Sequence, residues 1–280
     1  MKSMSFLGIP YYAGQPHQGV KNGPEVFRKA LGDLSYQFFI RDLGDITGLN
    51  SNNEYSNELI SQYKFTESDF HVNFGGDHGM SVGTIHRQLE KHPDLLVVWV
   101  DAHGDINPPW ESTTGNFHGM PLAYLLGISK FPWMKNFLSP KRLIYWGPRS
   151  LDTSERKIIE EMGIVCLTGD DLSDPENLMN AVRAIDPEME SPVHLSFDVD
   201  VYRTEDFSAT GCHTSGGPTR ENIEKMGREL FQKTNVVSMD LVEFNPDLSE
   251  ENSVEILSTF LKLNSEAIIP SSAGLSLHLP

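Results

Sequence analysis

The chain has 280 residues, with 22 Lys and Arg against 39 Asp and Glu and a formal net charge of −17. This acidic balance argues against binding to a nucleic-acid backbone, which needs clustered basic residues. No run approaches the ~18–20 apolar residues of a membrane span, and the opening MKSMSFLGIPYY is too short for a signal peptide. We therefore expect a globular protein with no nucleic-acid or membrane partner.

The two cysteines, Cys166 and Cys212, lie far apart in the sequence and cannot form a disulfide framework. This favours a reducing compartment, so we expect a cytoplasmic protein. Hydrophobic residues make up 39% of the chain, which is enough for a sizeable core and argues against disorder.

Short apolar runs rich in Val, Leu, Ile, Phe and Trp recur along the chain with little alternation of polar and apolar residues. Such runs are typical of strands buried on both faces of a parallel sheet that helices cover. The predicted strands are 5–9, 37–40, 70–74, 95–100, 142–146, 163–167, 193–197 and 236–242.

Longer segments between these strands show helical character and helix-start signals. The predicted helices are 24–31, 80–91, 120–126, 154–162, 175–184, 220–232 and 250–263. Thr219 or Pro218 begins the sixth helix, and Ser249 is a reasonable N-cap for the last. Repeated strand–helix units without a linker or internal repeat predict one α/β domain over residues 1–280. We expect an open, mostly parallel sheet of about eight strands flanked by helices on both faces.

Polar clusters follow four of the predicted strands, where ligands bind in open parallel sheets. The clusters are GGDHG at 75–79, DAHGD at 101–105, DVD at 198–200 and EFNP at 243–246. Each cluster alone is more often a turn with solvated side chains. Four of them at strand ends in one chain are hard to explain as turns, so we predict a site at this edge of the sheet.

The residue types in these clusters indicate a metal site made of nitrogen and oxygen ligands. Without a thiolate the set excludes structural zinc of the cysteine kind, and its oxygen-rich character favours Mn²⁺ over Zn²⁺. Six side chains are too many for one catalytic metal with an open position. They suit two ions bridged by carboxylates, with a shared water that is deprotonated near neutral pH. The six candidate ligands are His78, Asp101, His103, Asp105, Asp198 and Asp200.

In these motifs and their order the sequence resembles the ureohydrolase family, and within it the arginases. The family pattern has a Gly-Gly-Asp-His turn, an Asp-Ala-His-x-Asp loop, a Ser-Phe-Asp-x-Asp loop and a Glu-x-Asn-Pro loop. The resemblance runs from Gly8-Ile9-Pro10 to the last predicted helix, so it covers nearly the whole chain. It implies a hydrolase that uses two Mn²⁺ ions and a metal-bridging hydroxide to release urea from a guanidinium group. It also implies trimers or hexamers.

The resemblance also implies a role for each ligand. One manganese would be held by His78, Asp101, Asp105 and Asp198. The other would be held by His103, Asp101, Asp198 and Asp200, so that Asp101 and Asp198 bridge the pair. The resemblance adds Glu243 as the anchor of the substrate guanidinium and His118 as the proton shuttle, which we count with Asp105 as catalytic. The alternative for His118 is a helix-start residue satisfied by a backbone group.

Further resemblance concerns the substrate's amino-acid end. Asn107, Thr114 and Asn116 match positions that hold this end in arginases, and Asp152 matches the residue that faces the α-ammonium. Neutral donors suit an α-carboxylate, and a carboxylate suits an ammonium. A decarboxylated substrate such as agmatine would leave the donors unpaired, at a cost of about 1–3 kcal/mol. Turn formation is the alternative role for Asn107 and Asn116.

The chain departs from the family pattern after Asp200. Arg203 replaces an acidic residue, and Cys212 replaces a threonine near the guanidinium. The metal ligands are all retained, so these changes concern the substrate. L-arginine, giving ornithine, is the first choice. Nω-hydroxyarginine, agmatine, guanidinobutyrate and formiminoglutamate remain open, as does a catalytically silent metal-binding relative. Cys212 either contacts the substrate or is an inert small hydrophobe.

Overall fold

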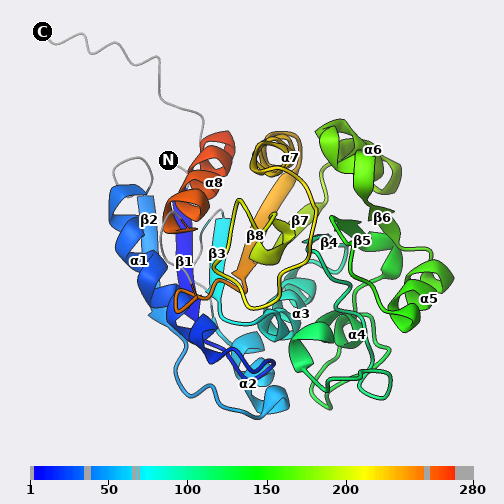
Figure 1. Cartoon of the computed structure of the whole chain (residues 1–280), viewed down its shortest axis with the longest axis horizontal. Helices are drawn as coiled ribbons and strands as arrows, with labels where there is room; N and C mark the ends of the chain where they lie inside the picture. Colours follow the sequence, from blue (N-terminus) through cyan, green and yellow to red (C-terminus); the bar gives the residue numbers. More distant parts are fainter. Residues whose placement is uncertain (1–2, 35–38, 65–67, 69, 249–252, 269–280) are drawn as a thin grey trace, which may run out of the picture.

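A computed structural model describes residues 3–34, 39–64, 68, 70–248 and 253–268. Its centre is one eight-stranded sheet in the order β2-β1-β3-β8-β7-β4-β5-β6, and every pairing of neighbouring strands is parallel (Figure 1). The strands are β1 (Ser3–Ile9), β2 (Phe39–Asp45), β3 (Phe70–Gly75), β4 (Leu96–Val100), β5 (Leu143–Trp146), β6 (Val165–Leu167), β7 (Pro192–Asp198) and β8 (Asn235–Val242).

Helices cover both faces of this sheet, which confirms the predicted fold class. One layer contains α1, α6, α7 and α8, and the opposite layer contains α2 to α5. The helices are α1 (Gly23–Leu34), α2 (Asn53–Ser61), α3 (Ser81–Lys91), α4 (Pro121–Leu125), α5 (Thr153–Met162), α6 (Pro175–Ile185), α7 (Arg220–Lys233) and α8 (Ser253–Ile268). None of these helices is long and apolar enough to cross a bilayer.

The central strand β4 shows why the apolar runs predicted a buried parallel sheet. Leu96, Val98 and Val100 pack toward α6, α7 and α8, whereas Val97 and Trp99 pack toward α3 and α4. All five side chains are fully buried. Burial of one such side chain contributes about 1.5–3 kcal/mol, so a polar residue on either side of β4 would destabilise the sheet.

Differences from the predicted elements lie at ends and in polar segments. The prediction that the sixth strand begins at residue 163 is wrong, because Gly163 has φ of 62° and terminates α5 in the left-handed conformation that glycine tolerates. The start of the predicted strand 37–40 lies outside the described residues, and β2 continues to Asp45. Helix α2 was not predicted because its sequence, NEYSNELIS, has few apolar residues.

Two N-caps were predicted from the sequence, and only one of them lies in the described residues. The Thr219 side chain accepts a hydrogen bond from the backbone N–H of Asn222 at 3.1 Å, which confirms the N-cap of α7. Ser249 lies outside the described residues. Helix α8 begins at Ser253 and runs to Ile268, beyond its predicted end at residue 263.

The strand order explains how one edge of the sheet collects the motifs. The chain passes from β3 to β4 across the positions that β8 and β7 occupy, so β3, β8, β7, β4 and β5 are consecutive neighbours. All these strands are parallel, and their carboxyl ends therefore lie at the same edge. Such a crossover region is where open α/β sheets bind ligands.

Beneath this edge lies a buried polar network centred on Asp240 of β8. Its carboxylate accepts hydrogen bonds from Asn73 Nδ2 at 2.6 Å, Ser81 Oγ at 2.8 Å and Thr84 Oγ1 at 2.5 Å. His194 Nε2 lies 3.4 Å away. Burial raises the pKa of Asp240, but His194 and the hydrogen bonds outweigh burial and lower the pKa to about 2. The ionised carboxylate is therefore the stable form of this group in the folded protein.

We expect the substitution Asp240→Asn to lower the free energy of unfolding by about 2 kcal/mol at pH 6. The folded pKa is depressed, so this contribution is present above the unfolded pKa near 4 and is lost as the pH falls toward 2. Urea unfolding of both proteins from pH 6 to pH 3 measures the difference. A difference that stays constant over this range would show that the Asp240 charge is not its source.

Candidate active site

Residues at the carboxyl ends of three strands, β3, β7 and β4, bring the predicted metal-binding side chains together. His78 follows β3 at the start of a 3-10 turn, and Asp101, His103 and Asp105 follow β4. Asp198 ends β7, and Asp200 lies in the 3-10 turn that follows it. These residues form two groups in which the potential ligand atoms lie within 4.8 Å of one another. The separate motifs therefore make one centre.

The first group surrounds His78. Its Nδ1 atom lies 3.1 Å from Asp101 Oδ2, 3.0 Å from Asp105 Oδ2 and 3.1 Å from Asp198 Oδ2. This buried nitrogen has no hydrogen-bond partner of acceptable geometry. The other ring nitrogen, Nε2, lies 2.8 Å from Ser196 Oγ, and the ring stacks on Trp99. The imidazole is thus fixed with Nδ1 facing three carboxylates.

The second group contains Asp101, His103 and Asp200. His103 Nδ1 lies 2.9 Å from Asp200 Oδ2 and 3.5 Å from Asp101 Oδ1. Asp101 therefore belongs to both groups through its two oxygens. Asp198 belongs to the first group only, and its Oδ1 accepts a hydrogen bond from the backbone N–H of Asp200 at 2.8 Å.

The carboxylates are crowded in a region that excludes water. Burial, and then the neighbouring Asp101, raises the pKa of Asp105 to about 7. Burial also raises the pKa of Asp198 well above its usual range, with Asp200 and Asp101 adding to the effect. Asp101 differs because hydrogen bonds from His103 and His78 outweigh its burial and lower its pKa. Without a cation the cluster retains protons, since charged carboxylates this close repel one another.

The donor set fits divalent cations. Nitrogen and carboxylate oxygen make up both groups, with no thiol in either. The unpartnered His78 Nδ1 and the adjacent carboxylate oxygens are the atoms that a cation would engage. Oxygen-rich ligand sets of this kind suit Mn²⁺ among the transition metals.

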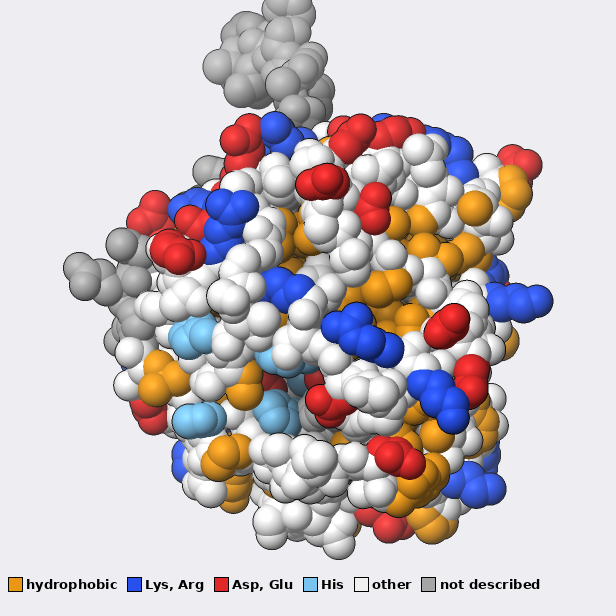
Figure 2. Space-filling model, turned by 45° about the vertical axis from the view of Figure 1, so that its right-hand side comes forward, with side chains coloured by type: hydrophobic (Ala, Val, Ile, Leu, Met, Phe, Trp, Pro, Cys, Tyr) orange, Lys and Arg blue, Asp and Glu red, His pale blue; other side chains and the backbone are white. Residues whose placement is uncertain are grey.

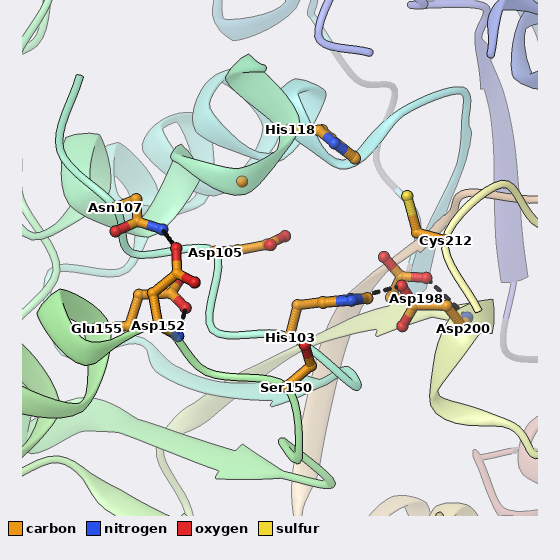
Figure 3. Close-up of a pocket in the computed structure, with 11 residues that line it drawn as sticks. His103, Asp105, Asn107, His118, Ser150, Asp152, Glu155, Asp198, Asp200 and Cys212 are labelled. Atoms are coloured by element: carbon orange, nitrogen blue, oxygen red, sulfur yellow. Dashed lines mark hydrogen bonds and ion pairs between the residues drawn. The ribbon is translucent and has the colours of Figure 1, made fainter. Parts of the chain in front are cut away.

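A cavity of about 160 Å³ opens beside the two groups, in the hollow where histidine and acidic side chains gather in Figure 2. Asn107 and Asp152 lie at one end of it, and Cys212 and Asp198 lie at the other (Figure 3). Of the predicted residues, the lining contains His103, Asp105, Asn107, His118, Asp152, Asp198, Asp200 and Cys212. The cavity therefore has an amide–carboxylate side and a side formed by residues of the two histidine–carboxylate groups and Cys212.

Glu243 and Asp105 have unusual backbone conformations. Their φ angles are 66° and 49°, which lie in a backbone region that residues other than glycine rarely occupy. Glu243 Oε1 accepts a hydrogen bond from the backbone N–H of His78 at 2.8 Å and lies 3.3 Å from His118 Nδ1. Gln15 Nε2 donates to Glu243 Oε2. Strain of this kind concentrates at functional sites, where the surrounding structure holds it in place.

His118 and Glu243 form an ion pair beside the cavity. Burial lowers the pKa of His118, but Glu243, and then Asp105 and Asp77, outweigh it and raise the pKa to about 9. The same contact helps to lower the pKa of Glu243 against the effect of burial. At neutral pH the histidine is therefore protonated and the carboxylate is charged.

Thr114 and Asn116 are not part of the cavity lining. Thr114 is exposed, and its Oγ1 accepts a hydrogen bond from the backbone N–H of Asn116 at 3.2 Å. By contrast, Asn107 Nδ2 donates to Asp152 Oδ2 at 2.8 Å, and Ser154 Oγ donates to Asn107 Oδ1 at 2.8 Å. The structure thus joins Asn107 to Asp152 and places Thr114 and Asn116 outside this cavity.

Three lining residues were missed from the sequence, Gly119, Ser150 and Glu155. Glu155 Oε2 accepts from the backbone N–H of Asp152 at 2.8 Å, while Glu155 Oε1 lies 3.4 Å from the backbone N of Ile106. It therefore links the loop that carries Asp105 to the loop that carries Asp152. The signal that could have revealed it is the Asp152-x-x-Glu155 capping box at the start of α5.

The glycine turn before His78 is needed for a reason other than positive φ. A Cβ atom on Gly76 would lie 1.6 Å from the backbone oxygen of Tyr11. This close approach is reinforced by a hydrogen bond from the N–H of Asp77 to the same oxygen at 2.9 Å. A side chain at position 76 would push apart the segments that hold His78.

Comparisons with known proteins agree with this geometry. The sequence model of the Arginase family matches residues 2–262. The hepatic arginase of Aquarana catesbeiana is 31% identical, over 94% of this chain and 91% of the relative. The structure of an arginase from Bacillus subtilis superposes with a TM-score of 0.84 at 29% identity, covering 94% of this chain and 98% of the other. The Entamoeba histolytica arginase in complex with L-ornithine gives 0.86 at 26% identity, with the same shares covered.

Proposed function

The chain belongs to the arginase family of hydrolases, which act on guanidino carbon–nitrogen bonds, and we propose that it is a binuclear manganese enzyme that converts L-arginine to urea and ornithine. The observation that carries the proposal is the pair of histidine–carboxylate groups that share Asp101. In the proposed centre, His78, Asp105 and Asp198 complete one half, and His103 and Asp200 complete the other. Asp198 is proposed as a second bridge because of the family resemblance.

When bound, divalent cations supply an activated water near neutral pH. The chain's own residues position the substrate and move protons around that water. Asp105 lines the cavity and would accept a hydrogen bond from the attacking water. Glu243 would pair with the guanidinium through its two oxygens, a charge-assisted contact that fixes the orientation of the reacting carbon. His118 would protonate the leaving amine nitrogen as the carbon–nitrogen bond breaks.

The opposite end of the cavity supports an amino acid as the substrate. Asp152 carries a carboxylate at that end, and Asn107 Nδ2 holds it at 2.8 Å. An α-ammonium group would pair with this carboxylate. Thr114 and Asn116 would bind the α-carboxylate, a role proposed from the resemblance alone. The L-ornithine in the Entamoeba histolytica arginase is an amino acid of this type.

Cys212 favours a second candidate, the hydrolysis of a modified guanidinium such as Nω-hydroxyarginine. Its side chain faces the cavity at the end where Asp198 lies (Figure 3). Burial, and then Glu243, raises the pKa of this thiol to about 12, so it is neutral at physiological pH. A neutral thiol is a weak hydrogen-bond partner, so it would not compete strongly with a polar substituent for the guanidinium nitrogen.

A substrate panel tests the proposal. The manganese-loaded protein should release urea and ornithine from L-arginine, and it should turn over guanidinobutyrate, which lacks the ammonium, more slowly. Asp152→Asn should lower kcat/KM for L-arginine about 10- to 100-fold and leave guanidinobutyrate nearly unchanged. Nω-hydroxyarginine and agmatine complete the panel. Two bound ions without turnover of any member would identify a catalytically silent relative, and equal losses on both substrates would remove Asp152 from the ammonium site.

The domain organisation and the location are proposed from more general observations. One continuous sheet includes strands from both ends of the described chain, which supports a single domain over residues 1–280. Two free cysteines support the cytoplasm as the proposed location. One similar relative, 32% identical, is the mitochondrial arginase-2 of Rattus norvegicus. A homo-oligomer, trimer or hexamer, is proposed from the resemblance.

A further inference from the structure

The two histidines of the proposed metal centre are held in different ways. His78 is fully buried, and its Nε2 atom, which points away from the carboxylates, faces Ser196 in strand β7. The His103 side chain is 29% exposed, and its Nε2 lies 3.2 Å from Thr214 Oγ1. Thr214 is a half-buried residue in the loop between β7 and α7, outside every motif considered above.

The segment that carries Thr214 is fastened to the metal-binding loops through Arg149. Arg149 Nη2 donates to the backbone oxygens of Asp200 at 3.1 Å and of Thr214 at 3.1 Å. Its Nε donates to the oxygen of Ser215 at 3.3 Å. One guanidinium therefore connects the loop of Asp200 with the segment of Thr214, and this places the hydroxyl relative to the second group.

Glycine is required next to this connection. Gly217 has φ of 100°, and a Cβ atom there would lie 2.8 Å from Arg149 Cζ and 3.0 Å from the backbone oxygen of Val201. The segment from Thr214 to Gly217 is thus packed closely against Arg149. Its backbone is held in place, so the Thr214 hydroxyl faces His103 as a built feature of the loop.

We propose that Thr214 is the positioning residue for His103, and that its hydroxyl sets the affinity of the half of the metal centre that contains His103 and Asp200. This inference rests on the proposed function. With Nδ1 directed at the cation, the His103 Nε2–H donates to Thr214 Oγ1, which fixes both the ring orientation and the tautomer. Removing the hydroxyl leaves Nε2 of the His103 ring without this hydrogen bond, so that the ring is held only at Nδ1. The half that contains His78 retains Ser196 and is unaffected.

Titration of the metal-free protein with Mn²⁺ tests the inference. Equilibrium dialysis with metal analysis counts the bound ions, and electron paramagnetic resonance detects the coupled pair. The wild-type protein should bind two ions. Thr214→Val, which keeps the shape but removes the hydroxyl, should bind one ion with unchanged affinity and the other about 10- to 100-fold more weakly. Thr214→Ser should restore the second affinity.

Ser215→Ala is the matched control, because Ser215 contacts Arg149 only through its backbone oxygen and its side chain is exposed. Thr214→Ala replaces the valine variant if that protein fails to fold, as judged by its thermal midpoint. Two ions bound by Thr214→Val as tightly as by wild type would overturn the inference and leave the proposed function standing. Equal weakening of both ions would overturn the selective role. A wild-type protein that binds fewer than two ions would instead contradict the binuclear centre.

Discussion

Replacement of Asp101 by alanine should remove both halves of the metal centre and lower kcat/KM for L-arginine by at least about a thousand-fold, or ~4 kcal/mol of transition-state stabilisation. The reason is its shared position. Asp101 Oδ2 lies 3.1 Å from His78 Nδ1, and Asp101 Oδ1 lies 3.5 Å from His103 Nδ1. No other residue of the two groups belongs to both. Metal analysis and urea release measure the two effects.

Two neighbouring carboxylates provide the controls. Asp105 belongs only to the His78 group and Asp200 only to the His103 group, so alanine at either position should leave one ion bound. Asp198→Ala tests whether Asp198 is a second bridge beside Asp101. Loss of both ions would support a second bridge, and retention of one ion would reject it. If Asp101→Ala still bound two ions, the shared-ligand assignment would fall.

The second large effect is expected at Glu243. Glu243→Gln keeps the shape of the side chain but removes the charge that would pair with the guanidinium, and we expect kcat/KM to fall about 10²- to 10³-fold. Glu243 is in neither metal-binding group, so the bound metal should stay at the wild-type level. The loss should therefore appear in steady-state kinetics and be absent from metal analysis.

The pH profile gives this variant an independent readout. Glu243 is the main cause of the raised pKa of about 9 at His118, so the pKa should fall toward the ordinary value near 6.5 in Glu243→Gln. If protonated His118 supplies the proton, activity is lost as the pH rises through that pKa. The alkaline limb should then move to lower pH in the variant. Glu205→Gln removes an equal charge from an exposed position and should change neither rate nor profile.

The sheet and its ligand-bearing edge were predictable because they depend on local patterns. Apolar runs such as 95–100 mark strands buried on both faces, and every predicted strand has a counterpart in the sheet. Parallel strands end at one edge of the sheet, so the sequence alone predicts that residues such as His78 and Asp198 lie close together. Helix α2 was missed because packing and its Asn52 cap stabilise a segment whose own sequence is weakly helical.

Features of the site that depend on contacts between distant segments were not predictable. The positive φ angles of Asp105 and Glu243 run against local preference and exist because surrounding contacts fix them. The contact of Thr214 with His103 joins residues 111 positions apart. No pattern within either segment indicates such a pairing.

The sequence by itself determined the fold class, the family and the chemical types gathered at one edge, because periodicity and residue order are local properties. Only the tertiary structure decided how the candidate ligands are distributed between two groups and which other residues line the cavity. Of the two carboxylates that the resemblance implied as shared, Asp101 belongs to both groups and Asp198 to one. The structure also left Thr114 and Asn116 outside the cavity and brought Glu155 into it. Distances of about 3 Å between side chains depend on how whole strands and loops pack, and local patterns carry no information about that packing. The acidic excess that first argued against nucleic acids includes a buried cluster of histidine and carboxylate groups that is able to hold metal ions.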